Sequence, residues 1–145
     1  EPYSTKKTIS NAMDVSDPSN FIRIQKIFNN DLQKLRKNVS SFSFNDTETE
    51  EAMRLLYNSY GYLTCPHSAV GYLGLKKYMG INKISNMNGI FISTAHCIKF
   101  KDVVDNSLSI SIKYPKSIND ILNKEKKSLS IESYSELKDF LLSRV

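Results

Sequence analysis

Three short segments carry most of the side chains that could do chemistry. The first comprises Ser10–Val15 and Pro18–Phe21, the second is Cys65–Val70, and the third is Ser93–His96. Together they hold amides, hydroxyls and both histidines of the chain, and such groups bind phosphate or carboxylate oxygens. No P-loop, dinucleotide-binding glycine pattern or Ser-His-Asp order accompanies them. The residue types therefore single out three candidate segments without matching any of these motifs.

The third segment has the strongest physical case, because it directly follows the hydrophobic run 89–93. In open α/β sheets ligands bind at the carboxyl ends of strands, and the free N–H groups of the next helix face the same crevice. Ser93 or Thr94 could instead cap that helix. On residue types alone both roles stay open, and the cap is favoured.

The histidines and cysteines raise the question of a zinc site. His67 and His96 each fall in the first turn of an expected helix, where a His more often packs or caps than catalyses. Cys65 and Cys97 lie beside them, but the adjacent His96 and Cys97 can hardly converge on one tetrahedral ion. We expect no metal site. Two cysteines also make no disulfide framework, and free thiols indicate a reducing compartment, the cytoplasm.

Composition excludes two further classes of protein. The net charge of +5 comes from 16 Lys and 4 Arg that are scattered along the chain, without the Arg-rich stripe of a nucleic-acid-binding protein. No apolar run reaches the roughly 18 residues that span a membrane. The chain opens without Met and without the apolar region of a secretory signal, so we expect a fragment of a longer protein. Nucleic acid and membrane are therefore not expected partners.

The elements that must position these segments follow from apolar spacing and turn residues. Residues 1–18 have no periodicity. Apolar residues spaced by three and four predict one buried helix stripe from Ser19 onward, comprising Phe21, Ile24, Phe28, Leu32 and Leu35. Thr47 and Glu50 have the spacing of a capping box for a helix that stops at Gly61. Pro66 suits the first turn of a helix ending near Gly80.

The remaining elements alternate in type. Helices are expected at about 95–105, 116–126 and 133–143, and extended pieces at 41–44, 62–64 and 89–93. This alternation predicts an α/β fold with a mainly parallel sheet flanked by helices. Three strands make an incomplete sheet, which again indicates part of a larger fold. We expect a segment lining the active site (1–18), an α/β core portion (19–105) and a helical extension (106–145).

The three segments, in this order and spacing, resemble the C-terminal part of bacterial and fungal threonine synthases. The matching motifs are a "SNAMDV…PSN-aromatic" segment, "PH-small-AV-x-Y" and "TAHP-x-KF". Here they stand at Ser10–Val15 with Pro18–Phe21, at Pro66–Tyr72 and at Thr94–Phe100. The resemblance is close over residues 5–105 and looser beyond. It departs at Cys97, which replaces the proline of the third motif, and at Cys65.

The resemblance implies a fold-type-II enzyme, similar to the tryptophan synthase β subunit, that uses pyridoxal 5'-phosphate. Such an enzyme converts O-phospho-L-homoserine and water to L-threonine and phosphate. It implies that Thr94 is the hydroxyl partner of the pyridine nitrogen. The remaining candidates, in or near the substrate pocket, are Asn11, Asp14, Ser19, Asn20, His67 and His96.

The same resemblance implies that no catalytic residue lies in this chain. The Schiff-base lysine and the glycine-rich phosphate cup belong upstream of residue 1, in a missing N-terminal portion of the same protein. Phe100-Lys101-Asp102 imitates the sequence around that lysine, but Lys101 is expected to be a solvated surface residue. The fragment alone is therefore expected neither to retain the cofactor nor to turn over substrate.

Two alternatives remain open from the sequence. One is another fold-type-II enzyme such as a threonine dehydratase, against which the first motif argues. The other is a non-catalytic module that retains the fold.

Overall fold

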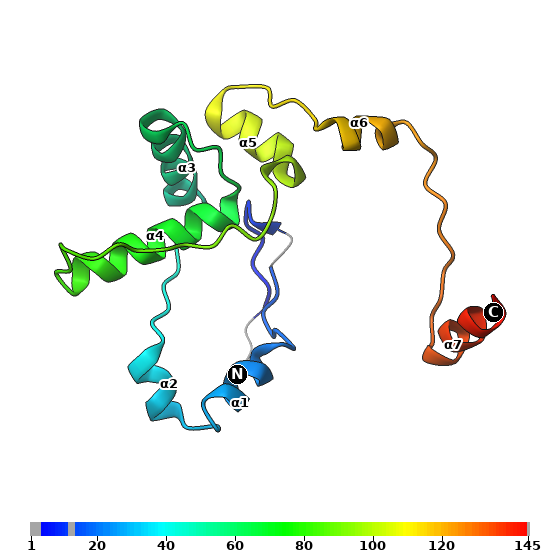
Figure 1. The fold of residues 1–145 in the computed structure, drawn as a ribbon, viewed down its shortest axis with the longest axis horizontal. Helices are drawn as coiled ribbons and strands as arrows, with labels where there is room; N and C mark the ends of the chain where they lie inside the picture. Colours follow the sequence, from blue (N-terminus) through cyan, green and yellow to red (C-terminus); the bar gives the residue numbers. More distant parts are fainter. Residues whose placement is uncertain (1–3, 12–13, 145) are drawn as a thin grey trace. The chain divides into compact units, whose positions relative to one another are not determined.

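Helices are the regular secondary structure in the part of the chain that the computed structural model describes, residues 4–11 and 14–144. Ala12 and Met13 of the first motif lie outside the described residues. The described residues contain no strand (Figure 1). They form two compact units, divided between Ile112 and Lys113. The predicted α/β fold with a mainly parallel sheet is therefore wrong for this chain.

The predicted strands fail because nothing pairs with them. Residues 41–44, 62–64 and 89–93 are extended, but no ladder of backbone hydrogen bonds joins them within the described residues. Ile90 is 87% exposed and Ile92 is 75% exposed, so the run expected to be a buried strand is largely in solvent. A strand is defined by its partner, and β-branched residues alone do not supply one.

The first unit is built around α3 (Asp46–Tyr60) and α4 (Pro66–Ile81). The capping box of α3 uses Asn45 and Glu48, two residues earlier than the predicted Thr47 and Glu50. Its C-cap is Gly61, as predicted, and a φ of 63° explains why glycine stands there. Pro66 begins α4, also as predicted, because its missing N–H is not needed in the first turn.

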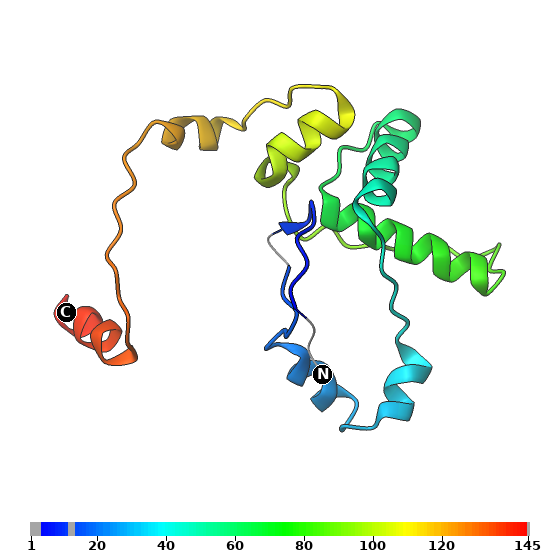
Figure 2. The same ribbon diagram turned by 180° about the vertical axis from the view of Figure 1, so that it is seen from behind.

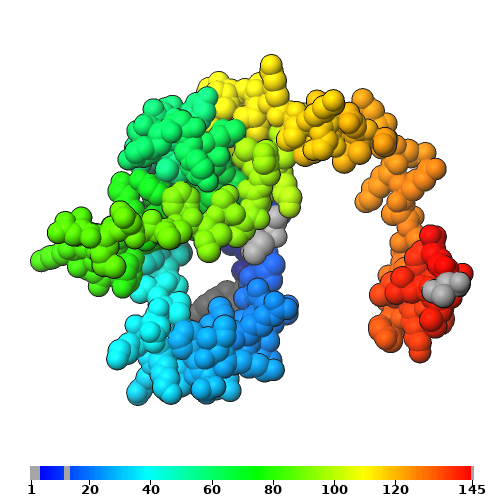
Figure 3. All heavy atoms as spheres, in the orientation of Figure 1, coloured from blue at the N-terminus to red at the C-terminus, as the bar shows by residue number. Residues whose placement is uncertain are grey.

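The core lies where α3, α4, the 3-10 helix η2 (Cys97–Phe100) and α5 (Lys101–Leu108) meet. In Figures 1 and 2 these helices lie against one another, and in Figure 3 their atoms, green to yellow, are in contact. The buried cluster comprises Ala52, Met53, Cys65, Ala69, Cys97, Phe100 and Val104. Arg54 of α3 also donates from Nε to the Ser107 carbonyl oxygen at 2.8 Å, which ties α3 to α5.

Two extended segments lie on α4. The ammonium group of Lys77 is 5.6 Å from the ring centroid of Phe42 and 5.3 Å from that of Phe44. On the other segment the ring of Phe91 meets Tyr62 at 6.1 Å and Tyr72 at 5.8 Å, both edge-on. These contacts hold residues 42–44 and 91 to the helix without any sheet.

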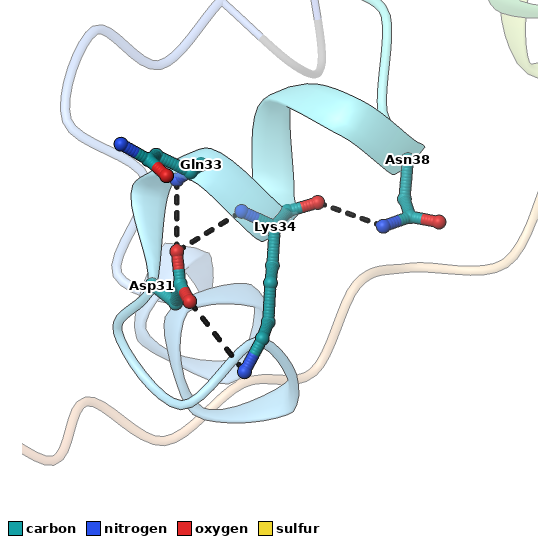
Figure 4. Close-up of polar contacts among 4 residues, drawn as sticks. All are labelled: Asp31, Gln33, Lys34 and Asn38. Carbon is teal, nitrogen blue, oxygen red and sulfur yellow. Dashed lines mark hydrogen bonds and ion pairs between the residues drawn. The ribbon is translucent and has the colours of Figure 1, made fainter.

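The expected long helix after Ser19 is two short helices, α1 (Phe21–Ile27) and α2 (Leu32–Asn38). Asn29 and Asn30 break it with φ values of 51° and 56°. Asp31 then caps α2 by accepting from the N–H groups of Gln33 and Lys34, each at 3.0 Å (Figure 4). Neither helix has a buried residue, so the predicted stripe does not form a core. Its residues other than Ile24 instead line a cavity of about 260 Å³ between the two helices.

The second unit contains α6 (Lys116–Leu122) and α7 (Tyr134–Leu142). Both helices are predicted: the expected range of α6 starts at the same residue and runs four residues too far, and that of α7 is one residue too long at each end. The Ser133 hydroxyl caps α7 by accepting from the Glu136 N–H at 3.2 Å. Within the described residues, no helix is long and apolar enough to cross a membrane.

Candidate functional site

The third motif begins in an extended segment and runs into η2, and His96 caps that helix. The Nδ1 atom of His96 accepts from the Ile98 N–H at 3.1 Å. Since Nδ1 is the acceptor, a neutral His96 ring carries its hydrogen on Nε2. The cap is therefore His96, and neither Ser93 nor Thr94, which corrects the role favoured from residue types.

Thr94 is an exposed residue with an unengaged hydroxyl. Among residues 4–11 and 14–144, nothing forms a hydrogen bond with its side chain. Because residues 89–93 form no strand, its predicted place at a strand's carboxyl end is wrong. The Thr94 hydroxyl is nevertheless accessible to a ligand, and it stabilises nothing by hydrogen bonding in the described part of the chain.

The second motif packs against the third. The ring of His67 lies 4.9 Å from that of Phe100, tilted by 56°. Both ring nitrogens of His67 are buried and have no hydrogen-bond partner within the part of the chain that the structure describes. The Ser68 hydroxyl donates to the Ser93 hydroxyl oxygen at 3.0 Å. Sequence reasoning did not find this last contact, which joins positions 25 residues apart.

The first motif forms a separate turn. The Asp14 carboxylate accepts from the Thr8 N–H at 2.8 Å and from the Thr8 hydroxyl at 2.7 Å. The Asp14 N–H in turn donates to the Asn11 carbonyl oxygen at 3.2 Å. Asp14 thus holds the turn, while the side chains of Asn11, Ser19 and Asn20 are exposed. Asn20 precedes α1 without a side-chain capping bond.

The structure therefore brings together two of the three motifs. Cys65, Ala69, Cys97 and Phe100 share one buried cluster, so the second and third motifs are fixed to each other. No hydrogen bond within the described residues joins residues 8–20 to Thr94. The first motif is attached to α3 instead, where Asp46 accepts from the Ile9 N–H at 3.2 Å.

The two cysteines are free and buried. Burial is the main cause that raises the pKa of the Cys97 thiol, and the neighbouring Cys65 adds to it. A raised pKa keeps the thiol protonated, whereas metal ligands and nucleophiles are thiolates. In the part of the chain that the structure describes, no three His, Cys, Asp or Glu residues are placed to hold a metal ion.

Lys101 is not the solvated lysine expected from the sequence. Its side chain is 18% exposed and forms an ion pair with Asp105, one turn along α5. Its ammonium group also donates to the Ile112 carbonyl oxygen at 2.7 Å. The Asp105 carboxylate accepts from the Ile112 N–H at 2.9 Å, so the pair closes the end of α5 onto residue 112.

The interactions of Asp105 with Lys101 and Ile112 predict that the free energy of unfolding falls at acidic pH. The Ile112 N–H and then Lys101 lower the pKa of Asp105 below its ordinary value of 3.8. A group with a lowered folded-state pKa stabilises the fold above its unfolded pKa, and that contribution is lost as pH falls through the folded value. We expect Asp105→Asn to reduce the loss of stability between pH 4 and pH 2, measured as urea midpoints. Asp102→Asn, on the same helix, is the control. An unchanged acid dependence in Asp105→Asn would contradict the assignment.

Comparison with known proteins identifies the family. A family model described as "Threonine synthase, C-terminal" matches residues 68–141, just over half of the chain. The chain belongs to this family. The match includes the third motif whole, and the resemblance drawn from the motifs is confirmed.

Curated threonine synthases match the chain over a greater length. The enzyme from Buchnera aphidicola of Acyrthosiphon pisum is 37% identical over 147 residues, which cover 99% of this chain and 32% of that protein. The Escherichia coli enzyme is 35% identical over 117 residues, or 81% of this chain and 26% of that protein. The chain spans about a third of the length of the curated relatives it matches.

Solved structures agree. The crystal structure of threonine synthase from Escherichia coli matches with a TM-score of 0.75 and 29% identity, covering 100% of this chain and 33% of that one. A pyridoxal-phosphate-bound threonine synthase from Brucella melitensis matches with a TM-score of 0.62. At 20% identity this second likeness concerns the fold alone.

Proposed function

We propose that this chain is the C-terminal part of a pyridoxal-phosphate-dependent threonine synthase, which converts O-phospho-L-homoserine and water to L-threonine and phosphate. The observation that carries the proposal is the family match over residues 68–141, which contains Thr94 and His96. The geometry also supports the proposal, because the Thr94 hydroxyl is exposed and forms no hydrogen bond within the described residues.

The residues present fit one contact to the cofactor. Thr94 offers a neutral hydroxyl for the pyridine nitrogen, and unlike a carboxylate it does not force that nitrogen to stay protonated. When bound, the cofactor supplies an electron sink for carbanions of the substrate. Lys101 does not fit covalent attachment, because its ammonium group is held by Asp105 and by the Ile112 carbonyl.

The other candidate residues divide by exposure. Asn11, Ser19 and Asn20 have exposed side chains that suit contacts with the phosphate or carboxylate oxygens of the substrate. Asp14 acts through the turn that it holds with Thr8. His67 and His96 shape the site, the first by packing on Phe100 and the second by capping η2.

The proposal assigns different tasks to different parts of the protein. Residues 1–18 line the active site, 19–105 carry the core with Thr94, and 106–145 form an extension. The rest of the synthase, about two thirds of the relatives' length, supplies the cofactor-binding lysine and the phosphate cup. We place the enzyme in the cytoplasm, which suits the two free thiols.

Product analysis tests the proposal. Full-length synthase is incubated with O-phospho-L-homoserine, and threonine and phosphate are measured together. We expect both in equal amounts. The 145-residue chain, tested in parallel with added cofactor, is expected to form no threonine and to show no absorbance of covalently bound cofactor.

Two results would oppose the proposal in different ways. A full-length protein that instead deaminates threonine is a dehydratase, and one that does neither is a non-catalytic module. Covalent loading of the 145-residue chain, at one cofactor per chain, would overturn the assignment of the attachment lysine to the remainder of the protein.

A further inference from the structure

Three side chains form a continuous polar contact from the core to the third motif. The Cys65 sulfur lies 3.3 Å from the Ser68 hydroxyl oxygen, and the Ser68 hydroxyl donates to Ser93 at 3.0 Å. Ser68 is only 1% exposed, whereas Ser93 is exposed. The contact therefore starts inside the protein and ends at the residue that precedes Thr94.

The direction of these contacts follows from their hydrogens. Ser68 has one hydroxyl hydrogen, and it is used toward Ser93. The remaining contact then requires the Cys65 thiol to donate to the Ser68 oxygen, so both bonds point outward. A buried hydroxyl with both neighbours in place has a fixed orientation, because losing either bond leaves a polar atom unsatisfied.

Ser93 lies in a segment that has little else to fix it. Among the described residues, the bond to Ser68 is the one hydrogen bond formed by residues 89–95. On one side Phe91 packs against Tyr62 and Tyr72, and on the other Ala95 packs against the core. Between these anchors the backbone at Ser93 and Thr94 depends on Ser68.

We propose that Ser68 is a positioning residue that holds Ser93, and through it Thr94, in the place from which the Thr94 hydroxyl meets the cofactor ring. The role of Thr94 rests on the proposed function. The restraint on residues 93 and 94 does not, because it belongs to the chain itself. The two claims can therefore be tested apart.

The restraint is tested by NMR relaxation on the 145-residue chain. Ser68→Ala removes the donor, and Ser93→Ala removes the acceptor at an exposed position that leaves the core intact. We expect each to lower the backbone order parameters of residues 93 and 94 from about 0.85 to below about 0.6. The double variant should add nothing. Ser107→Ala is the matched control, because Ser107 is also buried but its hydroxyl has no partner among the described residues.

The consequence for the site is tested in the full-length synthase. Both single variants should raise the dissociation constant of pyridoxal phosphate about 5-fold, while the control Ser107→Ala should leave it at the wild-type value. Unchanged order parameters in both single variants, or additive effects in the double variant, would overturn the proposal. A synthase that forms no threonine, in a chain that still loses order on Ser68→Ala, would refute the proposed function and leave the restraint standing.

Discussion

Replacing Thr94 with Val in the full-length synthase is expected to raise the dissociation constant of pyridoxal phosphate about 10- to 100-fold. Val has nearly the shape of Thr but lacks the hydroxyl, so on the proposed role of Thr94 the pyridine nitrogen of the bound cofactor loses its partner. A lost hydrogen bond that leaves a buried polar atom unsatisfied costs about 1–3 kcal/mol, and each 1.4 kcal/mol is tenfold in affinity. The constant is measured by titrating the apoenzyme with the cofactor.

Thr94→Ser is the matched variant, because it keeps the hydroxyl and removes only a methyl group. It should stay within about 3-fold of the wild type, since an exposed methyl group contributes little to packing. Equal losses in both variants would show that the methyl group matters and that the hydroxyl does not. An unchanged constant in Thr94→Val would remove Thr94 from the cofactor site.

The second large effect concerns stability. Met53→Ala is expected to lower the free energy of unfolding of the chain by about 2–5 kcal/mol, because it leaves a cavity in a close-packed core. Met53 is 0% exposed and belongs to the buried cluster that fixes the second motif to the third. Urea unfolding followed by circular dichroism gives the value from the shift in midpoint.

Leu55→Ala on the same helix provides the control. Leu55 is 38% exposed, so its truncation should cost less than about 1.5 kcal/mol. If both substitutions lowered the free energy of unfolding by similar amounts, then the face of α3 that carries Met53 would not be buried as the structure shows.

Residues that end or begin a helix predicted the bounds of α3 and α4 correctly where their effect is local. Gly61 ends α3 because glycine adopts a φ of 63° without steric cost, and Pro66 begins α4 because its ring suits a first turn. Both effects act within a few residues, so they can be recognised without knowledge of the tertiary fold. The observed capping box starts two residues before the predicted one, because Asn is as good an N-cap residue as Thr and Asn45 comes first in the sequence.

Non-local partners account for the failures. The apolar run containing Ile90 and Ile92 has the composition of a buried strand, but whether a strand forms depends on what lies beside it. Asn29 and Asn30 fall between apolar positions whose spacing continues unbroken through the bend. Periodicity records side-chain type and is insensitive to backbone conformation, so it missed the break between α1 and α2.

The family was predictable from the motifs, since residue types at fixed spacing are what a family shares, and the role of Thr94 stays a prediction. The arrangement of the candidate site was not predictable. That His96 caps η2, and that Ser68 reaches Ser93, depend on how the second and third motifs pack together. The ion pair between Lys101 and Asp105 has the usual spacing of four residues, but the hydrogen bonds that both side chains form with the backbone of Ile112 depend on where the chain turns after α5.

The burial of both free thiols means that the reactivity of the cysteines reports transient opening of the core. Cys65 and Cys97 belong to the cluster shared by four helices, and Cys65 is only 1% exposed, so a thiol-specific reagent reaches it poorly while the cluster is closed. Labelling can then proceed only during transient opening, and its rate at excess reagent counts those openings. The rate at which the cluster next to the third motif opens can thus be measured in the unaltered polypeptide, because its own cysteines report the opening.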